Sequence, residues 1–116
     1  MECKVIIGLP IYDGEQTIRR SIESILSQTF KNFILIISDN ASTDSTQIIC
    51  EEYEKKDKRI KYIRQKKNLG YLKNFKFVLN MANSKYFAWI ADDDFWDKSF
   101  LEKNIQILDS KEDVIA

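Results

Sequence analysis

Three consecutive carboxylates, Asp92, Asp93 and Asp94, follow directly after the apolar run of residues 86–91. Such a run reads as a buried strand, and open α/β sheets bind ligands at the carboxyl ends of their strands. Adjacent carboxylates repel one another, and a hard cation such as Mg²⁺ or Mn²⁺ offsets this repulsion because it prefers carboxylate oxygens. The triplet therefore predicts a divalent-cation site on a loop. The alternative is a solvated turn that leads into a helix N-terminus.

Two other apolar runs end at side chains that suit a nucleotide. Residues 4–9 lead into Pro10 and Tyr12, and residues 33–37 lead to Asp39. If the strands are parallel, all three endings share one edge of the sheet. Pro10 and Tyr12 would pack on a base, Asp39 would accept a hydrogen bond from a base or a ribose, and the cation would screen a diphosphate. Alternatively, Tyr12 is a surface aromatic and Asp39 caps the following loop.

The composition excludes several other chemistries. The 116 residues contain no histidine, which rules out histidine zinc sites and catalysis by serine–histidine or cysteine–histidine pairs within them. The sequence has neither G-x-G-x-x-G after the first strand nor a Walker G-x-x-x-x-G-K-[ST] motif, so NAD enzymes and P-loop proteins fit poorly. Lys and Arg together equal Asp and Glu at 18 each, so no net charge draws the chain to nucleic acid.

The sequence also bears on where the protein works. No apolar run reaches the roughly 18 residues of a membrane span, and the N-terminus is not a signal peptide. We therefore expect a cytoplasmic protein, or one at the inner face of the membrane. Cys3 and Cys50 form no metal-binding pattern and are expected to be reduced packing residues.

Hydrophobic periodicity predicts strands that alternate with helices. The strands are expected over residues 4–9, 33–37, 60–63 and 86–91, and the helices over 14–28, 42–56, 71–82 and from 97 onward. This alternation favours an α/β fold with a Rossmann-like, mostly parallel sheet of about four strands and helices on both faces.

Helix starts and inward faces can also be predicted. Asp13, with Gln16 as its capping-box partner, should begin the first helix. Ser42 should cap the second helix and Asp97 the fourth. The residues expected to face inward are Ile48, Ile49 and Tyr53 in the second helix and Phe100, Leu101, Ile105 and Leu108 in the fourth.

The last residues, Val114, Ile115 and Ala116, read as the start of another strand. We therefore expect residues 1–116 to be the N-terminal part of a longer protein, with a truncated sheet. An exposed strand edge favours pairing between chains, and the oligomeric state stays open.

Several motifs occur in a recognisable order. They are P-I-Y-D at 10–13, S-I-L-S-Q-T at 24–29, D-N-A-S-T-D at 39–44, R-I-K-Y-I at 59–63 followed by N-L-G at 68–70, and A-D-D-D at 91–94. In this order and spacing they resemble the P-x-Y-N, S-I-L-x-Q-T, D-D-G-S-x-D, R-I-x-Y-I…N-x-G and DxD segments of the inverting family 2 glycosyltransferases, which have the GT-A fold. The resemblance covers nearly the whole chain.

The resemblance implies a part that binds a nucleotide-sugar donor, with a UDP-sugar as the first expectation. Pro10 and Tyr12 would flank the base, Asp39 would bind the base or its ribose, and Asp92 would reach the ribose or phosphate region. The metal, Mg²⁺ or Mn²⁺, would bind Asp93 together with Asp92 or Asp94. The segment that would approach the diphosphate contains Lys73 and Asn74.

Three departures from the family pattern stand out. Ala91 occupies the first position of the common D-x-D-D pattern, so the metal site rests on the acids that follow. Asn40 and Ala41 replace D-G, which leaves Asp39 as the only acid at its strand end. The glycine of the family's R-N-x-G segment is absent, and residues 75–77 read F-K-F instead.

The resemblance also implies a mechanism in which an acceptor hydroxyl attacks the anomeric carbon and displaces the diphosphate. The general base is expected beyond Ala116, so no catalytic residue is assigned, and residues 1–116 alone are expected to bind donor and metal without transferring sugar. The acceptor would be a saccharide or a lipid-linked molecule in cell-surface polysaccharide synthesis. The alternatives are a non-catalytic domain with the same fold, and a metal-dependent phosphotransfer module.

Overall fold

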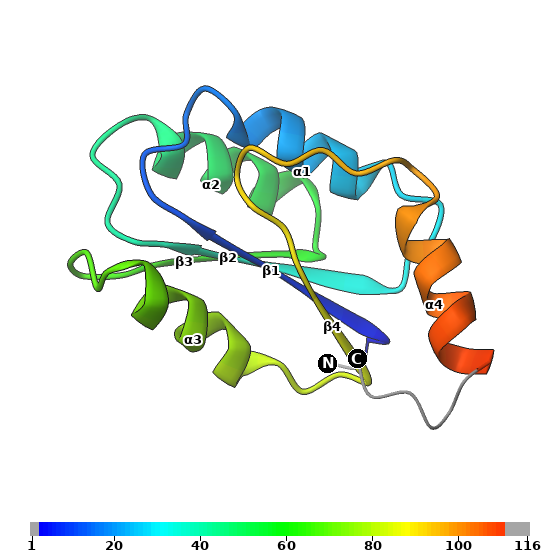
Figure 1. Ribbon diagram of the computed structural model, residues 1–116. Coiled ribbons are helices and arrows are strands. Elements are labelled where there is room, and N and C mark those ends of the chain that lie inside the picture. Colours follow the sequence, from blue (N-terminus) through cyan, green and yellow to red (C-terminus); the bar gives the residue numbers. More distant parts are fainter. Residues whose placement is uncertain (1–2, 111–116) are drawn as a thin grey trace.

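The structure is a computed structural model that describes residues 3–110, in which strands and helices alternate along the chain (Figure 1). The elements are β1 (Val5–Ile11), α1 (Ile18–Leu26), β2 (Phe33–Asp39), α2 (Thr46–Lys56), β3 (Ile60–Arg64), α3 (Tyr71–Met81), β4 (Tyr86–Trp89) and α4 (Phe100–Ser110). The predicted α/β pattern is therefore confirmed. The strand predicted at residues 114–116 lies outside the described residues.

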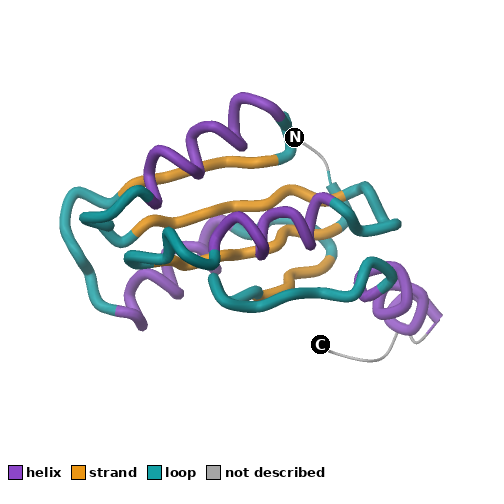
Figure 2. The backbone as a smooth tube through the Cα atoms, turned by 90° about the horizontal axis from the view of Figure 1, so that it is seen from above, coloured by secondary structure: helices purple, strands orange, loops and turns teal. Residues whose placement is uncertain are grey.

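The four strands form one parallel sheet in the order β3-β2-β1-β4, and Figure 2 shows them side by side. β1 pairs with β2 over its whole length, from Val5 opposite Phe33 to Ile11 opposite Asp39. The chain builds outward from β1 through β2 to β3 and then returns to place β4 on the other side of β1. The strand order thus reverses between β1 and β4, and ligands bind open α/β sheets at such a point.

Helices cover both faces of the sheet, as predicted. Alternate residues of β1 point to opposite faces, because side chains alternate along a strand. Val5 and Ile7 pack in a core with apolar residues of α1, α2 and α4, whereas Ile6 packs in a second core with Val78 of α3. Figure 1 shows α1 and α2 above the sheet and α3 below it.

The first helix begins later than predicted, and Asp13 does not cap it. The N-cap of α1 is Thr17, which makes no side-chain capping bond, and Asp13 has a positive φ of 49°. The Asp13 carboxylate accepts a hydrogen bond from the Thr43 N–H at 2.7 Å instead. A contact with a loop distant in sequence therefore replaces the local capping box.

The second and fourth helices also begin later than predicted. Ser42 is not the N-cap of α2, which is Ser45. Ile48, predicted to face inward, is 62% exposed. Asp97 accepts the Phe100 N–H through its backbone carbonyl, while its carboxylate accepts from the Ser99 hydroxyl. In α4, Leu101 and Ile105 are buried as predicted and Phe100 is 39% exposed.

The helix α4 is anchored to the sheet through Asp109. Its carboxylate forms ion pairs with Lys4 and Lys85 and accepts a hydrogen bond from the Tyr86 hydroxyl at 2.6 Å. Hydrogen bonds from Lys4 and then from Tyr86 hold the pKa of Asp109 well below its ordinary value. Lys4 precedes β1 and Tyr86 begins β4, so Asp109 ties α4 to the amino ends of both strands.

Replacing Asp109 by asparagine is expected to lower the melting temperature, and the loss should depend on pH. A carboxyl with a pKa that is lower in the folded chain stabilises the fold above its unfolded pKa of about 3.9, and this stabilisation disappears as the pH falls toward the folded pKa. Melting curves followed by circular dichroism should therefore show that the melting temperatures of the wild type and the variant converge from about pH 7 to about pH 3. A difference that stays constant over this range would contradict the assigned role.

No helix among residues 3–110 is both long and apolar enough to cross a bilayer.

Candidate functional site

Two adjoining hollows lie at the carboxyl edge of the sheet, where the order of the strands reverses. They have volumes of about 390 Å³ and about 250 Å³, and both are lined by Pro10, Tyr71 and Asp92. We call the two together the carboxyl-edge groove. The other residues that line it are Ile11, Tyr12, Asn40, Asn68, Gly70 and Asn74 in the first hollow and Phe75, Trp89, Ile90, Ala91 and Asp94 in the second.

Pro10 and Tyr12, which were predicted to pack on a base, both line the groove, and their contact with a base stays a prediction. Pro10 belongs to β1, and Tyr12, just beyond the strand, is 47% exposed. Tyr71, at the start of α3, adds a ring that is 75% exposed. Exposed aromatic and proline surfaces around one hollow are suited to packing against a flat apolar ring.

The second hollow has an aromatic wall that was not predicted. The rings of Phe75 and Trp89 stack with their centroids 3.3 Å apart, and Tyr71 stacks on Phe75 at 6.3 Å. The spacing of residues 71 and 75 places both on one face of a helix, and this was the sequence signal for the pair. The contact with Trp89 required knowing that α3 packs on this face of the sheet, from where Phe75 reaches the end of β4.

The loops after β1 and β2 are joined by hydrogen bonds. The Asp13 N–H donates to the Ser42 hydroxyl at 2.8 Å, and the Gly14 N–H donates to the Thr46 hydroxyl at 2.9 Å. The Asn40 N–H donates to the Ile11 carbonyl at 2.8 Å. In Figure 1 the loops after β1, β2 and β3 lie together at the left of the view. One side of the groove is therefore a connected network rather than separate turns.

Asp39 is part of this network and is completely buried. One carboxylate oxygen accepts from the Ser42 N–H at 2.9 Å and the Ser42 hydroxyl at 2.6 Å. The other accepts from the Tyr62 hydroxyl at 2.5 Å and lies 3.4 Å from the Arg64 guanidinium. Burial and the Asp39 carboxylate raise the pKa of Tyr62. A direct contact from Asp39 to a base or ribose stays a prediction, and both oxygens are already engaged.

Asn40, the next residue, is the one that lines the groove. Its side-chain oxygen accepts a hydrogen bond from the Leu69 N–H at 2.7 Å, and the residue is 3% exposed. The sequence interpretation treated Asn40 only as a departure from a family motif. The signal that was available is the alternation of side chains along β2, which turns Asp39 away from the groove if the strand extends that far.

The acidic loop of residues 92–94 lies at the opposite side of the groove, and α1 holds it in place. The Ser21 hydroxyl lies 2.7 Å from the carbonyl oxygens of both Asp92 and Asp94. Asp92 also packs against Gly14, where a Cβ would come within 2.6 Å of a carboxylate oxygen. The absence of a side chain at Gly14 therefore leaves the space that the Asp92 carboxylate fills.

The three acids have different surroundings. Asp92 is half-buried and lines both hollows, Asp94 lines the second, and Asp93 is exposed and lines neither. Burial raises the pKa of Asp92, and the Asp93 charge raises it further. Within residues 3–110, none of the three forms an ion pair with a lysine or an arginine. The loop therefore carries negative charge that no described cation offsets.

The carboxylates of the acidic loop fit a divalent cation that is coordinated by substrate phosphates as well as by the protein. The described part of the chain holds no cluster of three Asp, Glu, Cys or His side chains arranged for a metal. Mg²⁺ characteristically binds through one or two carboxylates together with water and substrate phosphates. Asp93 and Asp94 as the metal ligands stay a prediction.

Lys73 and Asn74 were predicted to approach a diphosphate, and only Asn74 lines the groove. Lys73 is exposed and lines neither hollow. Asn74 lines the first hollow, but its amide donates to the Ser38 carbonyl at 2.9 Å and its oxygen accepts from the Ser38 hydroxyl at 2.6 Å. Asn74 thus fixes α3 against β2, and contacts from either residue to a diphosphate stay predictions.

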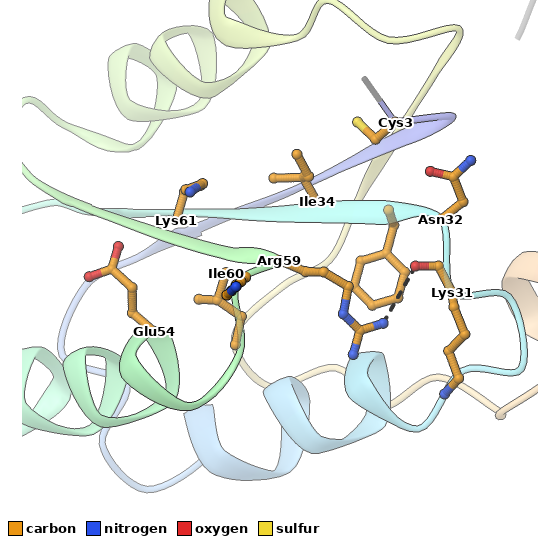
Figure 3. A pocket seen from close by; sticks show the side chains of 10 residues that line it. Cys3, Lys31, Asn32, Ile34, Glu54, Arg59, Ile60 and Lys61 are labelled. Atoms are coloured by element: carbon orange, nitrogen blue, oxygen red, sulfur yellow. Dashed lines mark hydrogen bonds between the residues drawn. The ribbon is translucent and has the colours of Figure 1, made fainter. Parts of the chain in front are cut away.

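A larger hollow of about 630 Å³ lies at the other end of the sheet (Figure 3). It is lined by the amino ends of β2 and β3, including Ile34 and Ile60, together with Arg59 and Lys31. Arg59 is already paired with Asp57 at 2.8 Å. This hollow lies away from the carboxyl ends of the strands and holds no acidic loop, so we do not assign the site there.

Comparisons with known proteins agree with the fold. Residues 6–116 match the family described as Glycosyl transferase family 2. An uncharacterized glycosyltransferase of Haemophilus influenzae is 39% identical over 105 residues, which make up 90% of this chain and 32% of that protein. The chain therefore spans about a third of the length of that relative.

Two solved structures have closely similar folds. S. aureus TarS 1–349 in complex with UDP-GlcNAc superposes with a TM-score of 0.87 at 26% identity, covering 94% of this chain and 32% of that one. The mannosyltransferase PcManGT from Pyrobaculum calidifontis in complex with GDP-Man and Mn²⁺ has a TM-score of 0.83 at 17% identity, covering 93% and 33%. At this lower identity the likeness concerns the fold alone.

Proposed function

Because the chain belongs to glycosyl transferase family 2, we propose that the carboxyl-edge groove binds a nucleoside-diphosphate sugar and that the protein transfers this sugar to an acceptor hydroxyl. A UDP-sugar is the first candidate, and TarS, which is 26% identical, is a structure in complex with UDP-GlcNAc. The acceptor would be a saccharide or a lipid-linked molecule of cell-surface polysaccharide synthesis.

The observation that carries this function is the composition of the groove. One side offers the exposed Tyr12 and Tyr71 rings with Pro10, and the other offers the acidic loop without a described counter-charge. A nucleoside diphosphate has the matching parts, since its base is flat and its phosphates require cations. Aromatic rings alone would suit many apolar ligands, and the acidic loop on the other side is what favours a ligand with phosphates and a cation.

In the transfer that we propose, the acceptor oxygen forms a bond to the anomeric carbon while the bond from that carbon to the diphosphate breaks. The acceptor proton passes to a general base that is not assigned here. The described residues would bind and orient the donor: Pro10 and Tyr12 hold the base, and Asp92 faces the ribose or phosphates. A divalent cation bound by Asp93 and Asp94 would supply positive charge that stabilises the leaving diphosphate.

UDP is expected to bind with an affinity that depends on a divalent cation. In titration calorimetry, Mn²⁺ should strengthen UDP binding at least about tenfold over the same titration with EDTA, because the cation screens the diphosphate from the acidic loop. Uridine, which lacks phosphates, is the control and should show no Mn²⁺ effect. If neither UDP, GDP nor UDP-GlcNAc binds with the cation present, the groove is not a donor site.

A further inference from the structure

Basic residues are concentrated in one continuous part of the sequence. Residues 58–91 contain nine lysines and arginines and no aspartate or glutamate, although the whole chain has 18 basic and 18 acidic residues. The rest of the chain therefore carries all of the acids and only half of the bases. Residues 58–91 include β3, α3, β4 and the loops between them. The zero net charge of the chain thus conceals a strong separation of charge.

The charges are separated in space as well. α3 covers one face of the sheet, whereas α1, α2 and α4 pack in the core on the other (Figure 1). Val78 is the buried side of α3, and Lys76 lies on its outward side. Lys61 of β3 shares a face of the sheet with Ile63, which packs in the core beneath α3. We call the exposed lysines of β3, α3 and the loop between them the basic surface, namely Lys61, Lys66, Lys67, Lys73 and Lys76.

The lysines of the basic surface are not used to hold the fold together. Within residues 3–110 none of them forms an ion pair. By contrast, Arg59 pairs with Asp57 at 2.8 Å, and Arg64 lies 3.4 Å from the Asp39 carboxylate. Unpaired charges of one sign on one surface attract a partner of the opposite sign.

Apolar side chains lie among these lysines. Leu72 and Leu79 are 60% and 45% exposed. They are four positions before Lys76 and three positions after it, so the three side chains share the outward side of α3. A membrane surface suits this combination, because leucines enter the apolar boundary of the bilayer while lysines contact the headgroups. A nucleic acid would match the lysines but would give the two leucines no apolar partner.

We propose that the basic surface docks on a bilayer that contains anionic lipids, with its lysines against the headgroup phosphates and with Leu72 and Leu79 in the apolar boundary. The carboxyl-edge groove adjoins this surface, since Asn68, which lines the first hollow, directly follows Lys67. Docking would hold the groove beside the membrane, where a lipid-linked acceptor is located. This advantage rests on the proposed function, whereas the docking itself is argued from charge and exposure.

The test is sedimentation of the chain with lipid vesicles. Vesicles of phosphatidylglycerol and phosphatidylcholine in equal parts should bind at least about tenfold more tightly than vesicles of phosphatidylcholine alone. The double variant Lys61→Gln, Lys76→Gln should bind the anionic vesicles at least about tenfold more weakly, because each lysine near such a surface strengthens binding about fivefold. The matched control, Lys98→Gln with Lys103→Gln, removes two exposed lysines outside the basic surface and should bind like the wild type.

The leucines distinguish a membrane from another anionic partner. The double variant Leu72→Ser, Leu79→Ser should weaken vesicle binding about fivefold or more, because apolar surface is no longer buried, and should keep the salt dependence of the wild type. That dependence should be steep, since the Debye length falls from about 10 Å to about 3 Å between about 0.1 M and about 1 M salt. If the leucine variant binds vesicles like the wild type while an RNA oligonucleotide binds more tightly than they do, the partner is a nucleic acid and the proposal is overturned.

The outcomes are distinguishable from a failure of the proposed function. The variant Lys61→Gln, Lys76→Gln should keep the circular dichroism spectrum and the UDP affinity of the wild type, because neither lysine lines the groove. Equal binding of the wild type to both kinds of vesicle, or binding to neither, overturns membrane docking even where UDP binds. If UDP does not bind and the anionic vesicles do, the proposed function fails and the docking surface stands.

Discussion

Replacing Asp93 by alanine is expected to abolish the Mn²⁺-dependent part of UDP binding, a loss of at least about tenfold or about 1.4 kcal/mol. Asp93 is exposed between two other acids, and none of the three pairs with a described lysine or arginine. A cation bound there would lose a ligand, while the diphosphate would still face Asp92 and Asp94 without screening. Calorimetry measures the UDP affinity of the same variant with and without Mn²⁺.

The control is Asp97→Ala, which removes the same charge four residues further along the chain. Asp97 lines neither hollow of the groove and should leave the Mn²⁺ effect unchanged. Asp92→Asn is the informative second variant, since Asp92 lines both hollows and the amide keeps its shape against Gly14. If Asp92→Asn removes the Mn²⁺ effect and Asp93→Ala does not, the metal ligand is Asp92.

Replacing Asp39 by alanine is expected to destabilise the protein by about 3 kcal/mol or more, since each buried group left without a partner costs about 1–3 kcal/mol. The substitution leaves the Ser42 N–H and the Tyr62 hydroxyl without their acceptor. For a chain of this size such a loss lowers the melting temperature by about 10 °C or more. Urea and thermal unfolding measure it directly.

Tyr62→Phe separates the contributions to this network. It removes one hydroxyl and keeps the Asp39 carboxylate with its bonds from Ser42, so a smaller loss of about 1–2 kcal/mol is expected. A different result for Asp39→Ala would support the direct contact with a base or ribose that the sequence predicted. If Asp39→Ala melts like the wild type but fails to bind UDP, Asp39 contacts the nucleotide directly.

The fold was largely predictable because its signals are local. Apolar runs separated by amphipathic helices define alternating strands and helices, and parallel pairing then places every strand end at one edge. Strand limits were harder. β2 extends two residues beyond the predicted end, so Asp39 shares the face of Leu35 and Ile37 and is buried with them. Counting alternate positions past Ile37 would have turned attention to Asn40.

Helix starts and groove contacts depended on residues distant in sequence. Asp13 and Ser42 have the side chains of good caps, but in the folded chain each binds the other's loop. No local pattern predicts such an exchange, because tertiary contacts override capping preference. The aromatic wall at Trp89 likewise arises only when α3 packs over β1 and β2, so that Phe75 reaches Trp89 of β4.

The hydrogen bonds that cross between the loops after β1 and β2 have a consequence for engineering. The contacts of Asp13 with Ser42 and Thr43, and of Gly14 with Thr46, make residues of one loop the structural partners of residues in the other. A chimera that takes only one loop from a relative would separate matched donors and acceptors. The two loops are therefore best grafted together, as one cassette, when donor preference is redesigned.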